Sequence, residues 1–254
     1  MAGITRTPKN PDAWARLRRW TPARIGLGRA GSSLPTQPML DFELAHARAR
    51  DAVHAAFDAD ALARALRDAG FGDAILVSSQ ARDRMEYLLR PDLGRSLDSD
   101  SRERLHAASP GAFAVVIGDG LSALAPARHA VPLLVELRRQ LDLWPNVTIV
   151  VANLARVALG DEIGEILRAD AVVVLIGERP GLSSPDSLGL YFTWAPRVGR
   201  TDAERNCISN VRPQGLPYAE AAARLTYLLR EARRLKISGV ELKDDSESSQ
   251  GALP

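Results

Sequence analysis

Residues 170–179, Asp-Ala-Val-Val-Val-Leu-Ile-Gly-Glu-Arg, give the clearest indication of the fold. They contain five consecutive apolar residues, 172–176, three of which are valine, followed by Gly and Pro residues that form turns. A short apolar run of this kind is typical of a strand buried on both faces in the middle of a parallel sheet. Because ligands of open α/β sheets lie at the carboxyl ends of the strands, we expect Glu178 and its neighbours to face a ligand or a partner.

Two other apolar runs have the same form. Residues 114–117 lead into Gly-Asp-Gly-Leu-Ser at 118–122, and residues 147–151 lead into Ala152 and Asn153. Helical patterns at about 126–141 and 161–167 separate the three runs. Alternation of strand and helix predicts a parallel sheet with right-handed crossovers, so the three polar loops should lie along one edge of one sheet.

The rest of the chain adds elements on both sides of this centre. Before it, the patterns predict two helices within 37–69, a strand at 74–79, and helices at about 83–89 and 99–108. After it, they predict an aromatic strand at 190–194 and an amphipathic helix at 218–235. The predicted class is α/β, a Rossmann-like parallel sheet flanked by helices, with an N-terminal helical extension.

The expected organisation has three parts. Residues 1–35 form a partly flexible N-terminal extension, and residues 36–243 form the Rossmann-like domain, which begins with helices. Residues 244–254 form a polar tail that we expect to be disordered. Lys and Arg outnumber Asp strongly in residues 1–30; a solvated arm is the favoured interpretation, and contact with an acidic partner is the alternative.

Composition excludes several classes of protein. A formal net charge of +2 over 254 residues gives no reason to expect a nucleic-acid partner. No apolar run comes near the ~20 residues that a membrane-spanning helix needs. The single cysteine, Cys207, excludes an internal disulfide and any zinc site built on paired thiolates, and it fits a location in the cytosol.

Familiar catalytic motifs are absent from the sequence. Gly26-Leu-Gly-Arg-Ala-Gly31 matches a dinucleotide fingerprint, but the preceding residues make a poor strand and Pro35 follows. The sequence has neither a Gly-x-Ser-x-Gly elbow nor a phosphate-binding loop of the Gly-x-x-x-x-Gly-Lys type. The four histidines lie far apart, so no metal site is predicted: His46, His54, His106 and His129.

Polar loops at the predicted strand ends remain as candidates for a site, and their residues are Asp119, Ser122, Asn153, Glu178 and Arg179. They form no triad of acid, base and nucleophile, which favours a binding subunit over a complete catalyst. The structural alternative is that Glu178 and Arg179 only fix loops by pairing with Asp202 or Arg205.

Six segments resemble the small subunit of ethanolamine ammonia-lyase, in the same order as in that family. They are residues 40–54, 90–95, 119–123, 157–164, 176–182 and 202–210. The resemblance extends over residues 20–243.

The resemblance implies a function. Members of this family take part in splitting ethanolamine into acetaldehyde and ammonia by radical chemistry with adenosylcobalamin. It also implies a large partner subunit with a barrel fold, six large and six small chains in the assembly, and the bacterial cytoplasm as location, within a microcompartment. The small subunit would close over the cofactor at the interface and would not be catalytic alone.

The resemblance further implies three contacts to adenosylcobalamin: Val157, Glu178 and Cys207. The sequence motifs that contain them are intact. Proteins that replace the cofactor's base with a histidine carry Asp-x-His-x-x-Gly, and Asp51-Ala-Val-His54 has the wrong spacing. We therefore expect base-on cofactor and no catalytic residue or cobalt ligand from this chain.

An alternative from another class is a stand-alone module that binds cobalamin or a nucleotide and delivers or senses it. Binding of adenosylcobalamin by this chain without a partner would favour the module. Residues 1–19 lie outside the resemblance; we expect them to keep the chain soluble or to direct it to a microcompartment shell, which deleting them would test.

Overall fold

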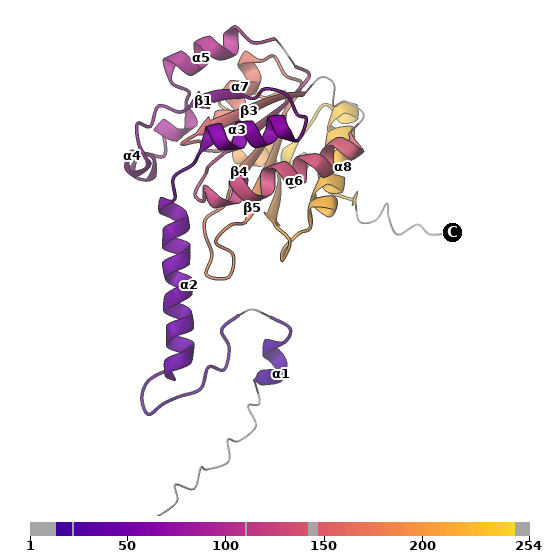
Figure 1. Ribbon diagram of the computed structural model, residues 1–254. Helices are drawn as coiled ribbons and strands as arrows, with labels where there is room; N and C mark the ends of the chain where they lie inside the picture. The colour runs from indigo at the N-terminus through magenta and orange to yellow at the C-terminus, as the bar shows by residue number, and fades with distance from the viewer. Residues whose placement is uncertain (1–13, 22, 110, 142–146, 247–254) are drawn as a thin grey trace, which may run out of the picture. The chain divides into compact units, whose positions relative to one another are not determined.

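The computed structural model describes residues 14–21, 23–109, 111–141 and 147–246. The chain consists of two compact units, residues 1–48 and 49–254, and the boundary between them lies within helix α2 (Thr36–His54). The larger unit is α/β, as predicted, with a six-stranded sheet between layers of helices (Figure 1).

The predicted helices and strands of the larger unit are confirmed, with small shifts at their ends. The strands are β1 (Ile75–Ser78), β2 (Phe113–Gly118), β3 (Val147–Asn153), β4 (Ala171–Gly177), β5 (Leu188–Trp194) and β6 (Asn206–Val211). The helices are α3 (Ala59–Asp68), α4 (Arg84–Leu89), α5 (Ser99–His106), α6 (Leu124–Gln140), α7 (Leu159–Ile166) and α8 (Tyr218–Leu235). Short 3₁₀ helices are η1 (Leu93–Arg95), η3 (Asp202–Glu204) and η4 (Gly239–Glu241).

The sheet is mixed. Its strand order is β1-β3-β2-β4-β5-β6; the first four strands are parallel, and β5 and β6 are antiparallel to their neighbours. A helical crossover joins parallel strands, whereas only the loop of residues 178–187 connects β4 to β5. A connection that short without a helix returns the chain antiparallel. The sheet is therefore parallel only in its first four strands.

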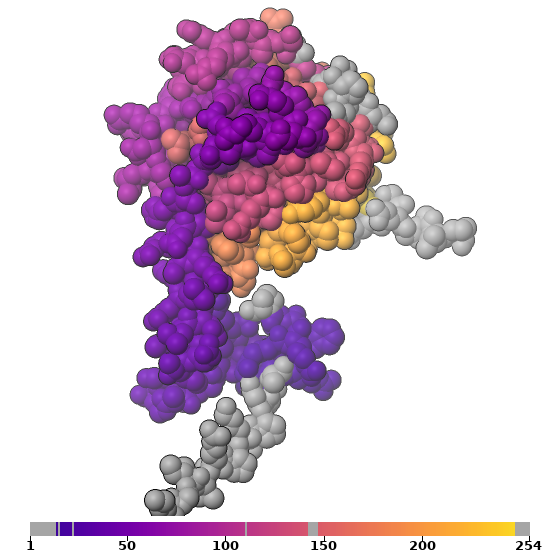
Figure 2. Space-filling view, in the orientation of Figure 1, coloured from indigo at the N-terminus to yellow at the C-terminus, as the bar shows by residue number. Residues whose placement is uncertain are grey.

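Alternate residues of the central strands pack into two separate hydrophobic cores, one on each face of the sheet. Val115, Ile117 and Val173 pack with α3, α6 and α8 on one face. Val116, Val172 and Val174 pack with α5 and α7 on the other. Figure 1 shows α3, α6 and α8 side by side over the sheet, and Figure 2 shows them as a continuous surface. Burial on both faces explains why β2 and β4 are unbroken apolar runs.

The crossovers leave the sheet on opposite faces. Helix α5 leads from β1 to β2, and α7 leads from β3 to β4, both on one face, whereas α6 leads from β2 to β3 on the other. The loops that follow the neighbouring strands β3 and β2 therefore diverge. That divergence opens the crevice in which open α/β sheets bind ligands.

The end of β4 packs directly against the loop that follows β2. Leu121 donates its backbone N–H to the Gly177 carbonyl at 2.9 Å. A Cβ at Gly177 would lie 2.0 Å from the Ser122 carbonyl oxygen, so no larger residue fits without movement. Glu178, the next residue, is thereby held beside the loop that carries Asp119.

The smaller unit contains the short helix α1 (Ala15–Arg18). Arg18 donates its Nε to the Ile25 carbonyl at 2.9 Å. The Gly26–Gly31 pattern is not flanked by a strand, and the next helix, α2, begins at Thr36. Residues 1–13 and 247–254, which include parts of the predicted extension and tail, lie outside the described residues. Within the described chain, no helix has both the length and the apolar character that crossing a bilayer requires.

Candidate functional site

Glu178 joins three strands at the ligand-facing edge of the sheet. It follows β4, and its Oε2 accepts from the Ser187 hydroxyl at 2.6 Å and from the Asn210 backbone N–H at 3.2 Å. Its other oxygen, Oε1, accepts no hydrogen bond from the part of the chain that the structure describes. Glu178 also has no ion pair with Arg205, which bonds to Asp161 instead. The half-buried carboxylate therefore keeps an acceptor available for a ligand.

Tyr191 and Cys207 face each other across β5 and β6. The thiol is exposed, 3.2 Å from the Ser209 hydroxyl, and the phenol is half-buried. Burial, and then the neighbouring Cys207, raise the pKa of Tyr191 above its usual range, so the hydroxyl remains protonated. Gly189 lies between Tyr191 and the Glu178 side chain, and a Cβ there would come within 3.1 Å of both.

Val157 lies two residues before α7, is half-buried, and packs against the same core as Tyr191. Helix α7 approaches β4 closely, since a Cβ at Gly160 would lie 2.3 Å from Val174. Val174 in turn pairs with Tyr191 on β5. Val157, Glu178, Tyr191 and Cys207 therefore share one face of the sheet, which we call the Tyr191 face.

The Tyr191 face is open along β6 and, on β5, beside the half-buried Tyr191. The main helical contacts of these two strands in the described chain are with α6 and α8, which pack on the opposite face. Along β6 the residues alternate between exposed Cys207 and Ser209 and buried Ile208. A ligand or partner can therefore cover the Tyr191 face.

A buried ion pair fixes the base of this face. Arg205 donates to both oxygens of Asp161, from Nη1 at 2.5 Å and from Nη2 at 2.6 Å, and also to the Thr193 hydroxyl at 3.1 Å. Both charged side chains are only 2% exposed. Asp161 lies one turn after Val157, and Arg205 lies two residues before Cys207. The ion pair therefore connects the segment that carries Val157 to the segment that carries Cys207.

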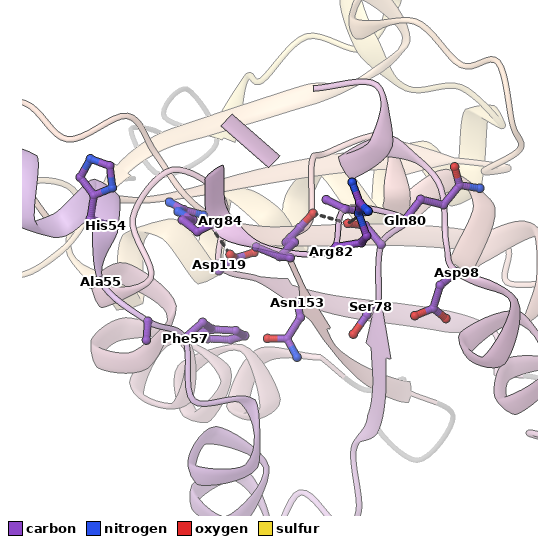
Figure 3. A pocket seen from close by; sticks show the side chains of 14 residues that line it. His54, Ala55, Phe57, Ser78, Gln80, Arg82, Arg84, Asp98, Asp119 and Asn153 are labelled. Carbon is purple, nitrogen blue, oxygen red and sulfur yellow. Dashed lines mark hydrogen bonds and ion pairs between the residues drawn. The ribbon is translucent and has the colours of Figure 1, made fainter. Parts of the chain in front are cut away.

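Asp119 and Asn153 line a separate cleft of about 580 Å³ at the ends of β1, β3 and β2 (Figure 3). Asp119 accepts from the Ala155 backbone N–H at 2.9 Å and from Arg84 at 3.0 Å. Val157, Glu178 and Cys207 do not line this cleft. The polar residues predicted for one edge thus form two groups, which we call the Tyr191 face and the Asp119 cleft. The structure also gives Ser122 a structural bond, from its hydroxyl to the Pro185 carbonyl at 2.8 Å.

The Asp119 carboxyl makes stability depend on pH. Burial raises its pKa from 3.8 to about 6, although Arg84 and the Ala155 N–H oppose the shift. The folded state therefore binds this proton more tightly than the unfolded state. The contribution of Asp119 to the free energy of unfolding is full below pH 3.8 and is lost as pH rises through 6. Relative to Asp119→Asn, the unfolding free energy of the wild type should fall by about 2 kcal/mol between about pH 4.5 and 6.5. Urea titrations of both proteins across this range measure it, and parallel pH profiles would contradict it.

Two residues of these sites were missed in the sequence. Tyr191 was assigned only to an aromatic strand, although alternation with the buried Phe192 would have placed it on the opposite face. Arg84 carries no sequence signal, because its partner Asp119 lies 35 residues away. The described residues contain no group of three or more His, Cys, Asp or Glu side chains that could hold a metal ion.

Together these features define an α/β binding subunit whose open mixed sheet presents polar and aromatic side chains on one face and at its strand ends. The family model for the ethanolamine ammonia-lyase light chain (EutC) matches residues 11–243. The chain belongs to this family.

Several similar proteins are named as the small subunit of ethanolamine ammonia-lyase. The chain is 58% identical over 249 residues to the ethanolamine ammonia-lyase small subunit of Pseudomonas aeruginosa, covering 93% of this chain and 91% of that one. It is 58% identical to the small subunit of Azotobacter vinelandii, covering 95% and 92%. It is 57% identical to that of Xanthomonas campestris, covering 95% and 92%. The resemblance seen in the sequence is confirmed: this is the small subunit of a two-chain lyase, with a large subunit as its partner.

Proposed function

We propose that this chain binds adenosylcobalamin together with the large subunit, at their interface, and thereby enables the conversion of ethanolamine to acetaldehyde and ammonia. The observation that carries the proposal is that Val157, Glu178 and Cys207 share the open Tyr191 face. These residues come from three different segments of the sequence, and folding brings them to one surface.

The chemistry of the Tyr191 face fits a corrin. A corrin combines a broad apolar ring with amide side chains that donate N–H groups. Glu178 has a free acceptor oxygen, Tyr191 and Val157 offer apolar surface, and the lack of a side chain at Gly189 lets the Glu178 and Tyr191 side chains lie close together. Glu178 would orient an amide of the cofactor, whereas Val157 and Cys207 would pack against its ring or its base.

This chain's contribution is binding and exclusion of water. The bound cofactor supplies a cobalt–carbon bond whose homolysis starts the removal of a hydrogen atom from ethanolamine. Tyr191 is neutral at physiological pH, and burial raises its pKa further, so it adds a hydrogen-bonding group without a charge. Covering the Tyr191 face with the large subunit would shield these groups from solvent and strengthen their hydrogen bonds.

Further parts of the proposal concern the assembly. We place the cofactor in the base-on form, with no cobalt ligand from this chain. The enzyme would contain six large and six small subunits, in the bacterial cytoplasm and within a microcompartment. A stand-alone cobalamin- or nucleotide-binding module is the alternative, and the family membership weighs against it.

Co-expression with a large subunit tests the proposal. A tag on this chain should co-purify the larger partner, and acetaldehyde should form only when both chains, ethanolamine and adenosylcobalamin are present. A large subunit that is fully active without this chain would contradict the proposal.

The exposed Cys207 thiol gives an independent test of the face. A thiol reagent should label Cys207 in the chain alone, since its side chain is exposed, and the complex with adenosylcobalamin should protect it. Cys207→Ser should retain most activity, because a hydroxyl keeps the size of a residue that only packs. Equal labelling rates in the chain alone and in the loaded complex would remove Cys207 from the interface.

A further inference from the structure

The Asp119 cleft has the position of a ligand site in an open α/β sheet. It lies at the carboxyl ends of β1, β3 and β2, where the loops after β3 and β2 diverge to opposite faces. Its outer wall is formed by residues 54–57, between α2 and α3, and by residues 78–82 after β1. At about 580 Å³ it is within the usual size of small-molecule pockets.

Arg84 forms part of the inner wall of this cleft. It donates from Nε to the Val53 carbonyl at 2.7 Å, and from Nη1 to Asp119 at 3.0 Å and to the Gly120 carbonyl at 2.7 Å. Its Nη2 is buried, and the guanidinium lies over the Tyr87 ring, 4.9 Å from the ring centroid. Arg84 therefore fixes the loops around the cleft and leaves ligand contacts to other side chains.

Three side chains of the cleft are available to a ligand. The side chains of Ser78 and Asn153 are half-buried, line the cleft, and make no hydrogen bond within the described chain. Phe57, half-buried, adds an aromatic surface; Figure 3 shows these three side chains along one wall, below Arg84 and Asp119. Next to Asn153, Leu154 has a φ of 53°, a left-handed conformation that a leucine rarely adopts and that is common at binding sites.

The charges of the cleft favour a neutral ligand. Asp119 pairs with Arg84, and Arg82 pairs with Glu86 at 2.7 Å. The backbone N–H groups that could hold a phosphate are occupied: Gln80 bonds to the Ser96 carbonyl and Arg82 to the Glu86 carboxylate, both within 2.9 Å. A phosphate would therefore meet the carboxylates of Asp98 and Asp119, whereas the two arginines of the cleft, Arg82 and Arg84, are already paired.

We propose that the Asp119 cleft is a second binding site, separate from the Tyr191 face, and that it takes an uncharged nucleoside. A flat heterocycle would stack on Phe57. Sugar hydroxyls would bond to Ser78 and Asn153, which provide both donors and acceptors. The proposal is independent of cobalamin binding and is tested without that cofactor.

The test is equilibrium dialysis of the full-length chain against labelled adenosine and labelled uridine. At least one of them should bind saturably, with a dissociation constant on the order of 0.1 mM for a ligand of this size. Adenosine 5′-monophosphate and uridine 5′-monophosphate should bind at least about tenfold more weakly, because the phosphate has no partner in the cleft. No saturable binding of either nucleoside, or equal binding of the monophosphates, would overturn the proposal.

Variants locate the binding. Ser78→Ala and Asn153→Ala should each weaken binding by about tenfold, the value of one hydrogen bond, without disturbing the fold. Met85→Ala is the matched control, since Met85 is exposed on α4 beside Arg84 and does not line the cleft. If Ser78→Ala and Asn153→Ala bind as well as Met85→Ala, the nucleoside binds elsewhere and the proposal fails. Loss of binding in the complex with the large subunit would also overturn it, because the partner would then occupy the cleft.

Discussion

Arg205→Ala is expected to lower the free energy of unfolding of the chain by about 3–5 kcal/mol, the cost of removing one partner of a buried ion pair. The substitution leaves the Asp161 carboxylate 2% exposed and without its guanidinium. The Thr193 hydroxyl also loses its partner. Another partner, Asp202, is fully exposed and lies 3.4 Å away, so it contributes little.

Two further variants separate the ion pair from general effects of losing an arginine. Arg234→Ala removes an exposed pair with Glu231 and should cost less than about 1 kcal/mol. Arg205→Met combined with Asp161→Leu should recover most of the stability, because no buried charge remains. Urea denaturation followed by circular dichroism compares the four proteins. A cost for Arg205→Ala no larger than that for Arg234→Ala would show that the buried pair is not needed.

Glu178→Ala is expected to weaken adenosylcobalamin binding to the two-chain complex by about 10- to 100-fold, which corresponds to about 1–3 kcal/mol for an unpaired buried polar group. The substitution removes the free Oε1 acceptor, and it also removes the acceptor of Ser187 and Asn210. Titration of the complex, followed by the absorbance of the cofactor, measures the affinity.

Glu178→Gln is the matched control for geometry. Its amide oxygen can still accept from Ser187 and Asn210, so the strand ends should stay in place and the loss of affinity should be smaller. If Glu178→Ala leaves the affinity of a fully assembled complex unchanged, Glu178 has no contact with the cofactor and only fixes the loops at the ends of β5 and β6.

Much of the fold was predictable because strands that are buried on both faces are unbroken runs of apolar residues. The apolar run at 172–176 and the alternation of strands with helices predicted β2, β3, β4, α6 and α7. Strand β6 was not predicted: only Ile208 and Val211 are buried, and its other residues are polar or exposed. The antiparallel return of β5 depends on pairing with β4, which no local pattern specifies.

The sites were predictable only in part, for a related reason. Local sequence placed Asp119, Asn153 and Glu178 at strand ends, and the resemblance to the family supplied Val157 and Cys207. The separation of these residues into the Tyr191 face and the Asp119 cleft depends on strand order and on the side from which each crossover leaves. Pairings over long sequence distances, such as Asp161 with Arg205, emerge only in the folded chain.

The central claim is that the Tyr191 face and the large subunit hold the cofactor jointly. Equilibrium dialysis of adenosylcobalamin against this chain, the large subunit and their complex tests it most directly. We predict that the complex binds the cofactor and that each subunit alone binds it at least about 100-fold more weakly, since each buries only part of the ligand. Equal affinity of the large subunit alone and of the complex would contradict the claim, and so would tight binding by this chain without a partner.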